Sequence, residues 1–200
     1  MKGMVSKYTL VPALAILVMA AILMGASAGL SDLRAENIQK EHIYMMQTVL
    51  PGSESFVREF YAGEDANVKS VHRAENGLVV ETVTQGYAGE IAMMIGVNND
   101  GHVTGLVIRD MQETIGLGHN ALTDADFLAQ FLNTSGGVAV AAGADAVSAA
   151  TGESAETTEV TVDAVTGATV TSKAVARSIN SAVAVVTGAD VASSATEWEG

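Results

Sequence analysis

The chain has 200 residues, of which 48% are hydrophobic and 16% are charged, and its formal net charge is −13. This length allows one modest domain plus an anchor, and the acidic balance argues against nucleic acid as a partner, because phosphate backbones are bound by surplus cations. The lack of cysteine excludes disulfides, thiolate-bound iron–sulfur clusters and thiol catalysis.

The N-terminus is an apolar segment. Thr9 to Leu30 carry no charge and are mostly Ala, Leu, Ile, Val and Met, which is roughly the length that crosses a bilayer as a helix. Lys2 and Lys7 precede this run. By the positive-inside tendency, we expect residues 1–30 to be a cytoplasmic N-terminus and transmembrane anchor, with the domain outside the cytoplasm. A cleaved signal peptide, with Ala26-Ser27-Ala28 as the cleavage site, is the alternative, and it also exports the domain.

Residues 31–50 predict a juxtamembrane helix that begins at Ser31 or Asp32 and is ended by Pro51-Gly52. We expect one domain over residues 51–187 and a polar tail over residues 188–200. Together with the elements that follow, this predicts an α+β fold in which an N-terminal transmembrane helix precedes a domain with an antiparallel-rich sheet and flanking helices.

The stretch from Val68 to Asp110 has the pattern of β-strands. Spaced apolar residues predict two strands joined near Glu75-Asn76-Gly77. A hairpin is expected next, because Ile91–Val97 and Val103–Ile108 flank the turn residues Asn98-Asn99-Asp100-Gly101.

A loop and a helix are expected after the hairpin. The two glycines of Glu113-Thr114-Ile115-Gly116-Leu117-Gly118 allow close backbone approach to a ligand or make a plain turn. Leu122–Leu132 predicts a helix with Thr123 as its N-cap. Its expected buried side consists of Phe127, Phe131 and Leu132. Residues 134–158 are rich in Ala, Gly, Ser and Thr and are expected to form a flexible insertion.

The stretch Asp163-Ala164-Val165-Thr166-Gly167-Ala168-Thr169-Val170-Thr171-Ser172 joins a predicted strand to a predicted helix. Val160 and Val162 lie among Thr and Asp residues, which suits a short strand. The dipeptide Gly167-Ala168 then gives a sterically open backbone. A similar layout around Thr151 has Ala149 in place of the glycine and no apolar-periodic helix after it, so Thr151 is expected to be unmodified linker.

A helix is predicted from Ser172 onward, with Thr171 or Ser172 as its N-cap. Thr169 is therefore expected on an exposed turn between strand and helix. Backbone N–H groups at a helix start favour an anion, and Lys173 can add a charge-assisted contact. A phosphate on Thr169 would be stabilised there.

The segment Asp163 to Thr169 resembles the flavin attachment motif of the FMN-binding domain family. That motif is an Asp, two variable residues, Ser or Thr, and then Gly-Ala-Thr, whose last Thr carries FMN through a phosphoester bond. The resemblance implies that Thr169 carries covalent FMN. It carries over, as further cofactor-binding residues of this segment, Asp163, Thr166, Gly167, Ala168, Thr171, Ser172 and Lys173.

Two further segments resemble the same family. Gly86-Tyr87-Ala88-Gly89 is similar to its Gly-Tyr-x-Gly segment, and the loop 113–118 is similar to its Glu-Thr-Pro-Gly-Leu-Gly, from which this chain departs at Ile115. The resemblance implies that this loop lies beside the flavin. Glu113 is carried over as a loop-fixing or site residue without an assigned acid–base role. The other loop residues implied in cofactor binding are Thr114, Gly116, Leu117 and Gly118.

Within the family, one anchor plus one domain resembles the G-subunit family of Rnf electron-transport complexes, which pass electrons between ferredoxin and NAD and move ions across the membrane. The related C-subunit family of sodium-pumping NADH:quinone reductases is generally longer. The resemblance implies other subunits of a membrane redox complex as partners, and a flavin transferase that installs the cofactor.

The alternatives are an exported FMN carrier of another electron-transfer chain and a non-redox, membrane-anchored binding domain. The four histidines form no recognised ligand spacing, so neither a metal site nor a catalytic constellation is predicted.

Overall fold

The computed structural model describes residues 7–141 and 160–188. Thr151, most of the predicted insertion and the tail from residue 189 onward lie outside the described residues. The chain forms two compact units, Met1–Ile43 and Tyr44–Gly200.

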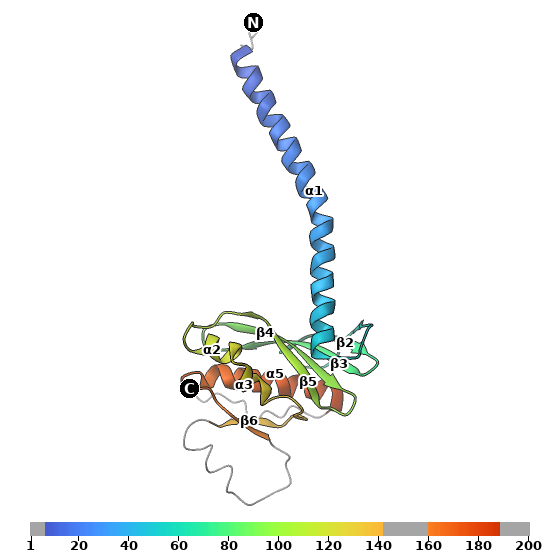
Figure 1. Cartoon of the computed structure of the whole chain (residues 1–200), viewed down its shortest axis with the longest axis vertical. Helices are drawn as coiled ribbons and strands as arrows, with labels where there is room; N and C mark the ends of the chain where they lie inside the picture. The colour runs from blue at the N-terminus through green and yellow to red at the C-terminus, as the bar shows by residue number, and fades with distance from the viewer. Residues whose placement is uncertain (1–6, 142–159, 189–200) are drawn as a thin grey trace, which may run out of the picture. The chain divides into compact units, whose positions relative to one another are not determined.

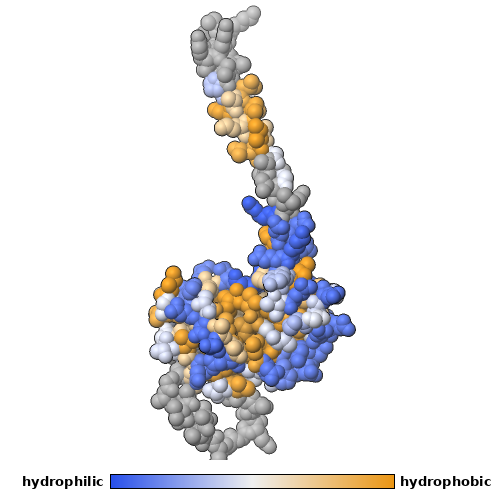
Figure 2. Space-filling view, viewed as in Figure 1, coloured by the Kyte–Doolittle hydropathy of each residue, from blue (hydrophilic) through white to orange (hydrophobic). Residues whose placement is uncertain are grey.

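Helix α1 (Lys7–Val49) is 43 residues long and contains Pro12. The sequence predicted a separate helix start at Ser31 or Asp32, but α1 passes through both residues without a break. In the first unit, the large apolar side chains between Leu14 and Met24 are exposed (Figure 2). Among the described residues, no helix reaches the combination of length and apolarity that a membrane span requires, so the predicted transmembrane anchor is not confirmed.

The second unit is built on a five-stranded antiparallel sheet with the strand order β1-β2-β3-β4-β5 (Figure 1). Its strands are β1 (Val57–Glu59), β2 (Val68–Ala74), β3 (Gly77–Gln85), β4 (Glu90–Asn98) and β5 (Val103–Met111). The strands and turns predicted between Val68 and Asp110 are confirmed. Gly101 has a φ of 84°, which a residue without a Cβ adopts freely in the predicted turn between β4 and β5. Strand β1 was not predicted.

Each face of the sheet is covered by a different helix. Helix α5 (Thr169–Thr187) lies across one face, where Val80, Ile91 and Ile95 pack against Val175 and Ile179 (Figure 1). Burial of this apolar surface supplies most of the driving force for folding of the unit.

The opposite face of the sheet receives the last turn of α1. Met46, Val49 and Leu50 are buried there against Val79 and Met94. The Thr104 hydroxyl donates a hydrogen bond of 2.6 Å to the carbonyl of Val49, which satisfies one of the unpaired carbonyls at the helix end. The predicted helix end before Pro51-Gly52 is confirmed.

Two short helices replace the single helix predicted over Leu122–Leu132. They are α2 (Gly118–Thr123) and α3 (Ala125–Ala129). Asp124, and not Thr123, is the N-cap, because its carboxylate accepts hydrogen bonds from the amides of Asp126 and Phe127. Phe127 and Phe131 are buried as predicted, but Leu132 is 45% exposed because the chain has already left the helix there.

A second, two-stranded sheet lies beside α5. Its strands are β6 (Val138–Ala141) and β7 (Val160–Asp163), which pair in parallel with Val138 opposite Val160. The side chain of Asn180 on α5 makes two hydrogen bonds of 3.0 Å to the backbone of Val138. The sequence placed Val138–Ala141 in a flexible insertion, and the structure shows that these residues form an ordered strand.

Candidate functional site

The predicted attachment segment forms a tight turn between β7 and α5. The amide of Ala168 donates to the carbonyl of Val165 at 2.9 Å, and Gly167 has a φ of 80°. This combination is the pattern of a type II turn, whose third residue needs a positive φ and therefore favours glycine. The turn delivers the chain directly into α5, and Thr169 is the first residue of that helix.

The predicted N-cap of this helix is wrong. Helix α5 begins at Thr169, and its N-cap is Ala168, which has no side-chain hydrogen bond to offer. Thr171 and Ser172 therefore lie inside the first turn. The Ser172 hydroxyl donates to the carbonyl of Ala168 at 3.0 Å and accepts from the amide of Val165 at 3.3 Å, so it fastens the turn to the helix. The sequence suggested a cap there because a hydroxyl near a helix start is usually one.

Within the described part of the chain, the first amides of α5 consequently have no hydrogen-bond acceptor. The first hydrogen bond of the helix runs from the Ser172 amide to the Ala168 carbonyl at 2.8 Å, and no described side chain caps the residues before it. Unpaired N–H groups and the helix dipole together favour an anion at this position. Thr169, the first residue of the helix, is half-buried at this position.

The loop 113–118 forms a second turn of the same kind. The amide of Leu117 donates to the carbonyl of Thr114 at 3.2 Å, and Gly116 has a φ of 89°. The two glycine turns face each other, because a Cβ placed on Gly167 would lie 3.3 Å from Cδ2 of Leu117. No atom lies within 4 Å of the Cβ position of Gly116, so that side of the loop is open. The loop and the attachment segment thus meet in space.

Glu113 connects two of the segments that resemble the family, its own loop 113–118 and the segment 86–89. Its Oε1 accepts hydrogen bonds from the amides of Tyr87 at 2.8 Å and Ala88 at 3.3 Å, which holds the segment 86–89. Its carboxylate fills the space beside Gly86 and Gly118, since a Cβ on either glycine would clash with it. Glu113, which was expected to be a loop-fixing or site residue, thus holds a segment 26 residues away in the chain.

Two buried oxygens meet beside Gly118 without a hydrogen-bond partner. They are Oε2 of Glu113 and Oγ1 of Thr171, and a Cβ on Gly118 would clash with the first and lie 2.5 Å from the second. Thr171 is only 1% exposed, so water does not reach its hydroxyl freely. Buried polar atoms are nearly always paired, and unpaired ones concentrate at functional sites. The base of this site therefore carries unused hydrogen-bonding capacity.

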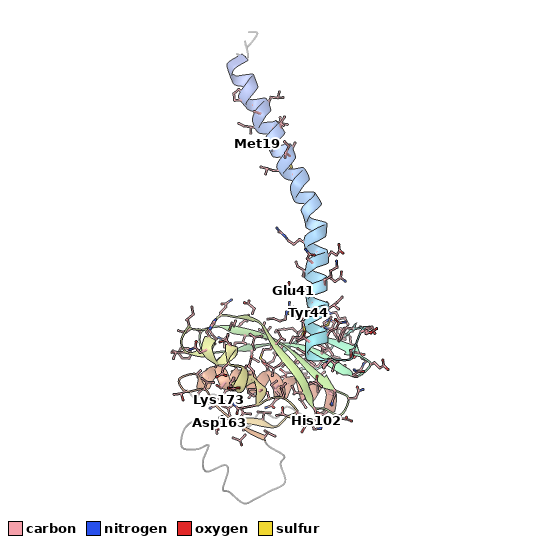
Figure 3. All side chains as sticks on the ribbon, viewed as in Figure 1. Met19, Glu41, Tyr44, His102, Asp163 and Lys173 are labelled. Carbon is pink, nitrogen blue, oxygen red and sulfur yellow. The ribbon has the colours of Figure 1, made fainter. Side chains whose placement is uncertain are left out.

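The charged residues of the attachment segment lie at its surface (Figure 3). Asp163 ends β7, and its backbone is held by Gln130, whose Oε1 accepts from the Asp163 amide at 2.8 Å. Its carboxylate is exposed. Lys173 is exposed one helical turn after Thr169, and Thr166 is exposed within the turn.

Sequence reasoning missed Arg177 as a residue of this region. It lies on α5, is half-buried, and donates from a terminal guanidinium nitrogen to the carbonyl of Gln85 at 2.7 Å. Gln85 immediately precedes the segment 86–89 that Glu113 holds. The available signal was its spacing, because Arg177 follows Thr169 by eight residues in an otherwise small and apolar helix.

Residues 86–184 match the FMN-binding domain family, and this range contains all three segments that resemble that family. The chain is 33% identical over 130 residues to the G subunit of the proton-translocating ferredoxin:NAD(+) oxidoreductase complex of Clostridium ljungdahlii, a match that covers 65% of this chain. The matched region spans 60% of that relative's length.

The solved structures include NqrC of Shewanella oneidensis, which matches with 20% sequence identity and a TM-score of 0.43, over 67% of this chain and 65% of that one. The match of the sequence itself and the three segments within it identify the domain. Residues 86–184 of this chain belong to the FMN-binding domain family.

Proposed function

We propose that the chain carries FMN on Thr169 through a phosphoester bond and that it transfers electrons. The observation that carries this proposal is the start of α5, where the half-buried Thr169 is the first helical residue and no side chain of the described residues caps the helix. The match of residues 86–184 to the FMN-binding domain family supports the same cofactor. When bound, FMN supplies the electron-accepting chemistry, and the protein holds and orients it.

The residues present fit a flavin phosphate. A phosphoester on Thr169 keeps a negative charge, which the amide donors and dipole of α5 stabilise. The cofactor also needs apolar surface beside its attachment point, and Ile115 and Leu117 offer it, because they are 83% and 44% exposed on the loop that faces the attachment turn. The open side of Gly116 leaves room for a bulky group. A covalent link also keeps the local flavin concentration high where free FMN would be diluted.

Attachment requires a group-transfer step that a separate flavin transferase performs. Oγ1 of Thr169 forms a new bond to the phosphorus of the FMN half of FAD, the pyrophosphate bond breaks, AMP leaves, and the hydroxyl proton passes to a base. Atoms balance with FAD as the co-substrate. Thr169 is in this scheme a substrate of the transferase, and it has no role as a nucleophile during electron transfer.

We further propose that the chain belongs to a membrane-bound, ion-translocating complex of the Rnf type, with other redox subunits as its partners. The 33% identity to the Clostridium ljungdahlii protein supports this assignment. The apolar residues exposed along α1 support a single membrane anchor, with a cytoplasmic N-terminus and the domain on the other side. Membrane fractionation before and after alkaline extraction tests the anchor, and recovery of the full chain in the soluble fraction contradicts it.

Intact mass and in-gel flavin fluorescence, measured after co-expression with a flavin transferase, test the attachment. We expect the wild-type chain to gain one FMN less one water, and Thr169→Ala to gain nothing. Thr151→Ala is the matched control that should still load, because Thr151 lies outside the motif. An unmodified wild-type chain, under conditions that load a known acceptor, would contradict the proposal and leave an anchored binding domain as the alternative.

A further inference from the structure

Three residues of α5 follow one another along the same side of the helix. Lys173 and Arg177 come four and eight residues after Thr169, and this spacing places side chains on one face. With a rise of about 1.5 Å per residue, Lys173 lies roughly 6 Å and Arg177 roughly 12 Å along the axis from Thr169. A cation thus follows the attachment point at one helical turn and again at two.

Arg177 lies at the edge of the candidate site. Its guanidinium contacts the Gln85 carbonyl at 2.7 Å, and the next residues form the segment 86–89, which Glu113 holds through the Tyr87 amide. Tyr87, two residues after Gln85 in the chain, is 69% exposed. The backbone that Arg177 contacts therefore leads directly into the segment that Glu113 holds.

Arg177 lacks a counter-charge among the described residues. Arg73 pairs with Glu59, and Arg109 lies 3.2 Å from Glu81, but no carboxylate of the described ranges lies within 4.0 Å of Arg177. Half-burial without an anion lowers the pKa of Arg177 from its usual value. A half-buried cation without a counter-charge lowers the stability of the fold unless a bound group supplies negative charge. The chain has a net charge of −13, so it has more carboxylates than are needed to pair with its cations.

The distance along α5 between Thr169 and Arg177 determines which part of a bound flavin would lie near Arg177. A phosphate on Thr169 is within reach of the α5 amides and of Lys173, but it lies about two helical turns from Arg177. The ribityl chain separates the phosphate from the ring, so the ring lies at the Arg177 end when the chain follows α5. An exposed aromatic residue, Tyr87, lies in the segment that follows the Gln85 contact, and it offers a ring for stacking in this direction.

We propose that Arg177 is a positioning residue that faces the carbonyl edge of the flavin ring and raises its reduction potential. Electrons that the ring receives from a neighbouring redox partner add negative charge to that edge. A half-buried guanidinium stabilises this charge more than water-screened cations do, so it favours the reduced form. This inference rests on the proposed attachment of FMN to Thr169.

The test is a redox titration of the FMN-loaded protein with dithionite and mediators. We expect Arg177→Gln and Arg177→Met to load normally by mass and to have a lower midpoint potential than the wild type. Arg177→Lys, which keeps the charge, should retain most of the wild-type potential. Arg58→Gln is the matched control, because this exposed arginine lies on β1 outside the candidate site, and its effect should be small and abolished by salt.

Three outcomes would overturn the inference. Unchanged potentials in both neutral variants would show that the ring does not sense Arg177. An equal drop in Arg177→Lys would assign the effect to the Gln85 contact instead of the charge. Loss of loading in both neutral variants would place Arg177 in maturation. Failure of the wild-type chain to load is detected by mass beforehand, and it contradicts the proposed attachment to Thr169 instead.

Discussion

The carboxylate of Glu113 accepts a hydrogen bond of 2.8 Å from the amide of Tyr87, and it occupies the space that a Cβ on Gly118 would need. One side chain thereby fixes the segment 86–89 and sets the position of the first residue of α2. A carboxylate that accepts backbone amides makes charge-assisted hydrogen bonds, which are roughly twice as strong as neutral ones. The shape of the candidate site therefore depends on Glu113 more than on any residue of the attachment turn.

Glu113→Ala should loosen the site and destabilise the domain. It removes the acceptor for two amides, and losses of this kind cost about 1–3 kcal/mol. We expect a lower urea midpoint and reduced FMN loading. Glu113→Gln keeps an oxygen acceptor and should lose less of both. Glu90→Ala, at an exposed position on β4, serves as the control. Equal stability of Glu113→Ala and the control would show that the 86–89 segment holds itself.

A matched pair of glycine substitutions separates backbone strain from crowding. Gly116→Ala meets open space but forces alanine to a φ of 89°, which costs about 1 kcal/mol. Gly118→Ala would drive a methyl group into Glu113 and Thr171, so it should cost about 1–3 kcal/mol and disrupt the site. Urea unfolding and FMN loading measure both effects. If Gly118→Ala loads as well as Gly116→Ala, the two buried oxygens have room to move apart.

Ile115→Pro should stabilise the protein. Ile115 is the second residue of the turn closed by the Leu117 amide and the Thr114 carbonyl, and Gly116 with its positive φ is the third. Proline fits that second position of a type II turn, and it restricts the unfolded chain. We expect a gain of about 0.4–1 kcal/mol in the free energy of unfolding, read from thermal or urea unfolding. A loss of stability would mean that the backbone before Ile115 cannot accommodate the ring.

The antiparallel sheet could be predicted from the sequence because its signals are local. Spaced valines and the turns near Asn76 and Asn98 set the strands and their order without help from distant residues. Strand β6 escaped prediction because Val138–Ala141 is short and lies in an alanine-rich stretch. Its order comes from parallel pairing with β7 and from the Asn180 side chain, which are contacts across long sequence separations.

In the candidate site, too, the features with a local sequence signal could be predicted and those that depend on distant contacts could not. The turn at Gly167 could be predicted because glycine before a helix has a local conformational reason. The start of the helix could not be predicted, because the N-cap residue Ala168 has no capping side chain. Ser172 suggested a cap, but its hydroxyl instead donates to the Ala168 carbonyl. The roles of Glu113 and Arg177 depend on contacts 26 and 92 residues away in the chain, which no spacing rule contains.

Asp163→Ala should abolish FMN loading without changing stability. The carboxylate of Asp163 is exposed. The residue is fixed through its backbone amide, which donates a hydrogen bond of 2.8 Å to the Gln130 side-chain oxygen. The side chain is therefore free to contact the transferase, and we propose that it is presented for that recognition. Gln130→Ala is the reciprocal control, because it removes the backbone contact and should lower stability while Asp163 remains. Intact mass and thermal unfolding read the two effects separately. Normal loading of Asp163→Ala would remove Asp163 from recognition, and a large drop in its melting temperature would make it a structural residue of the turn.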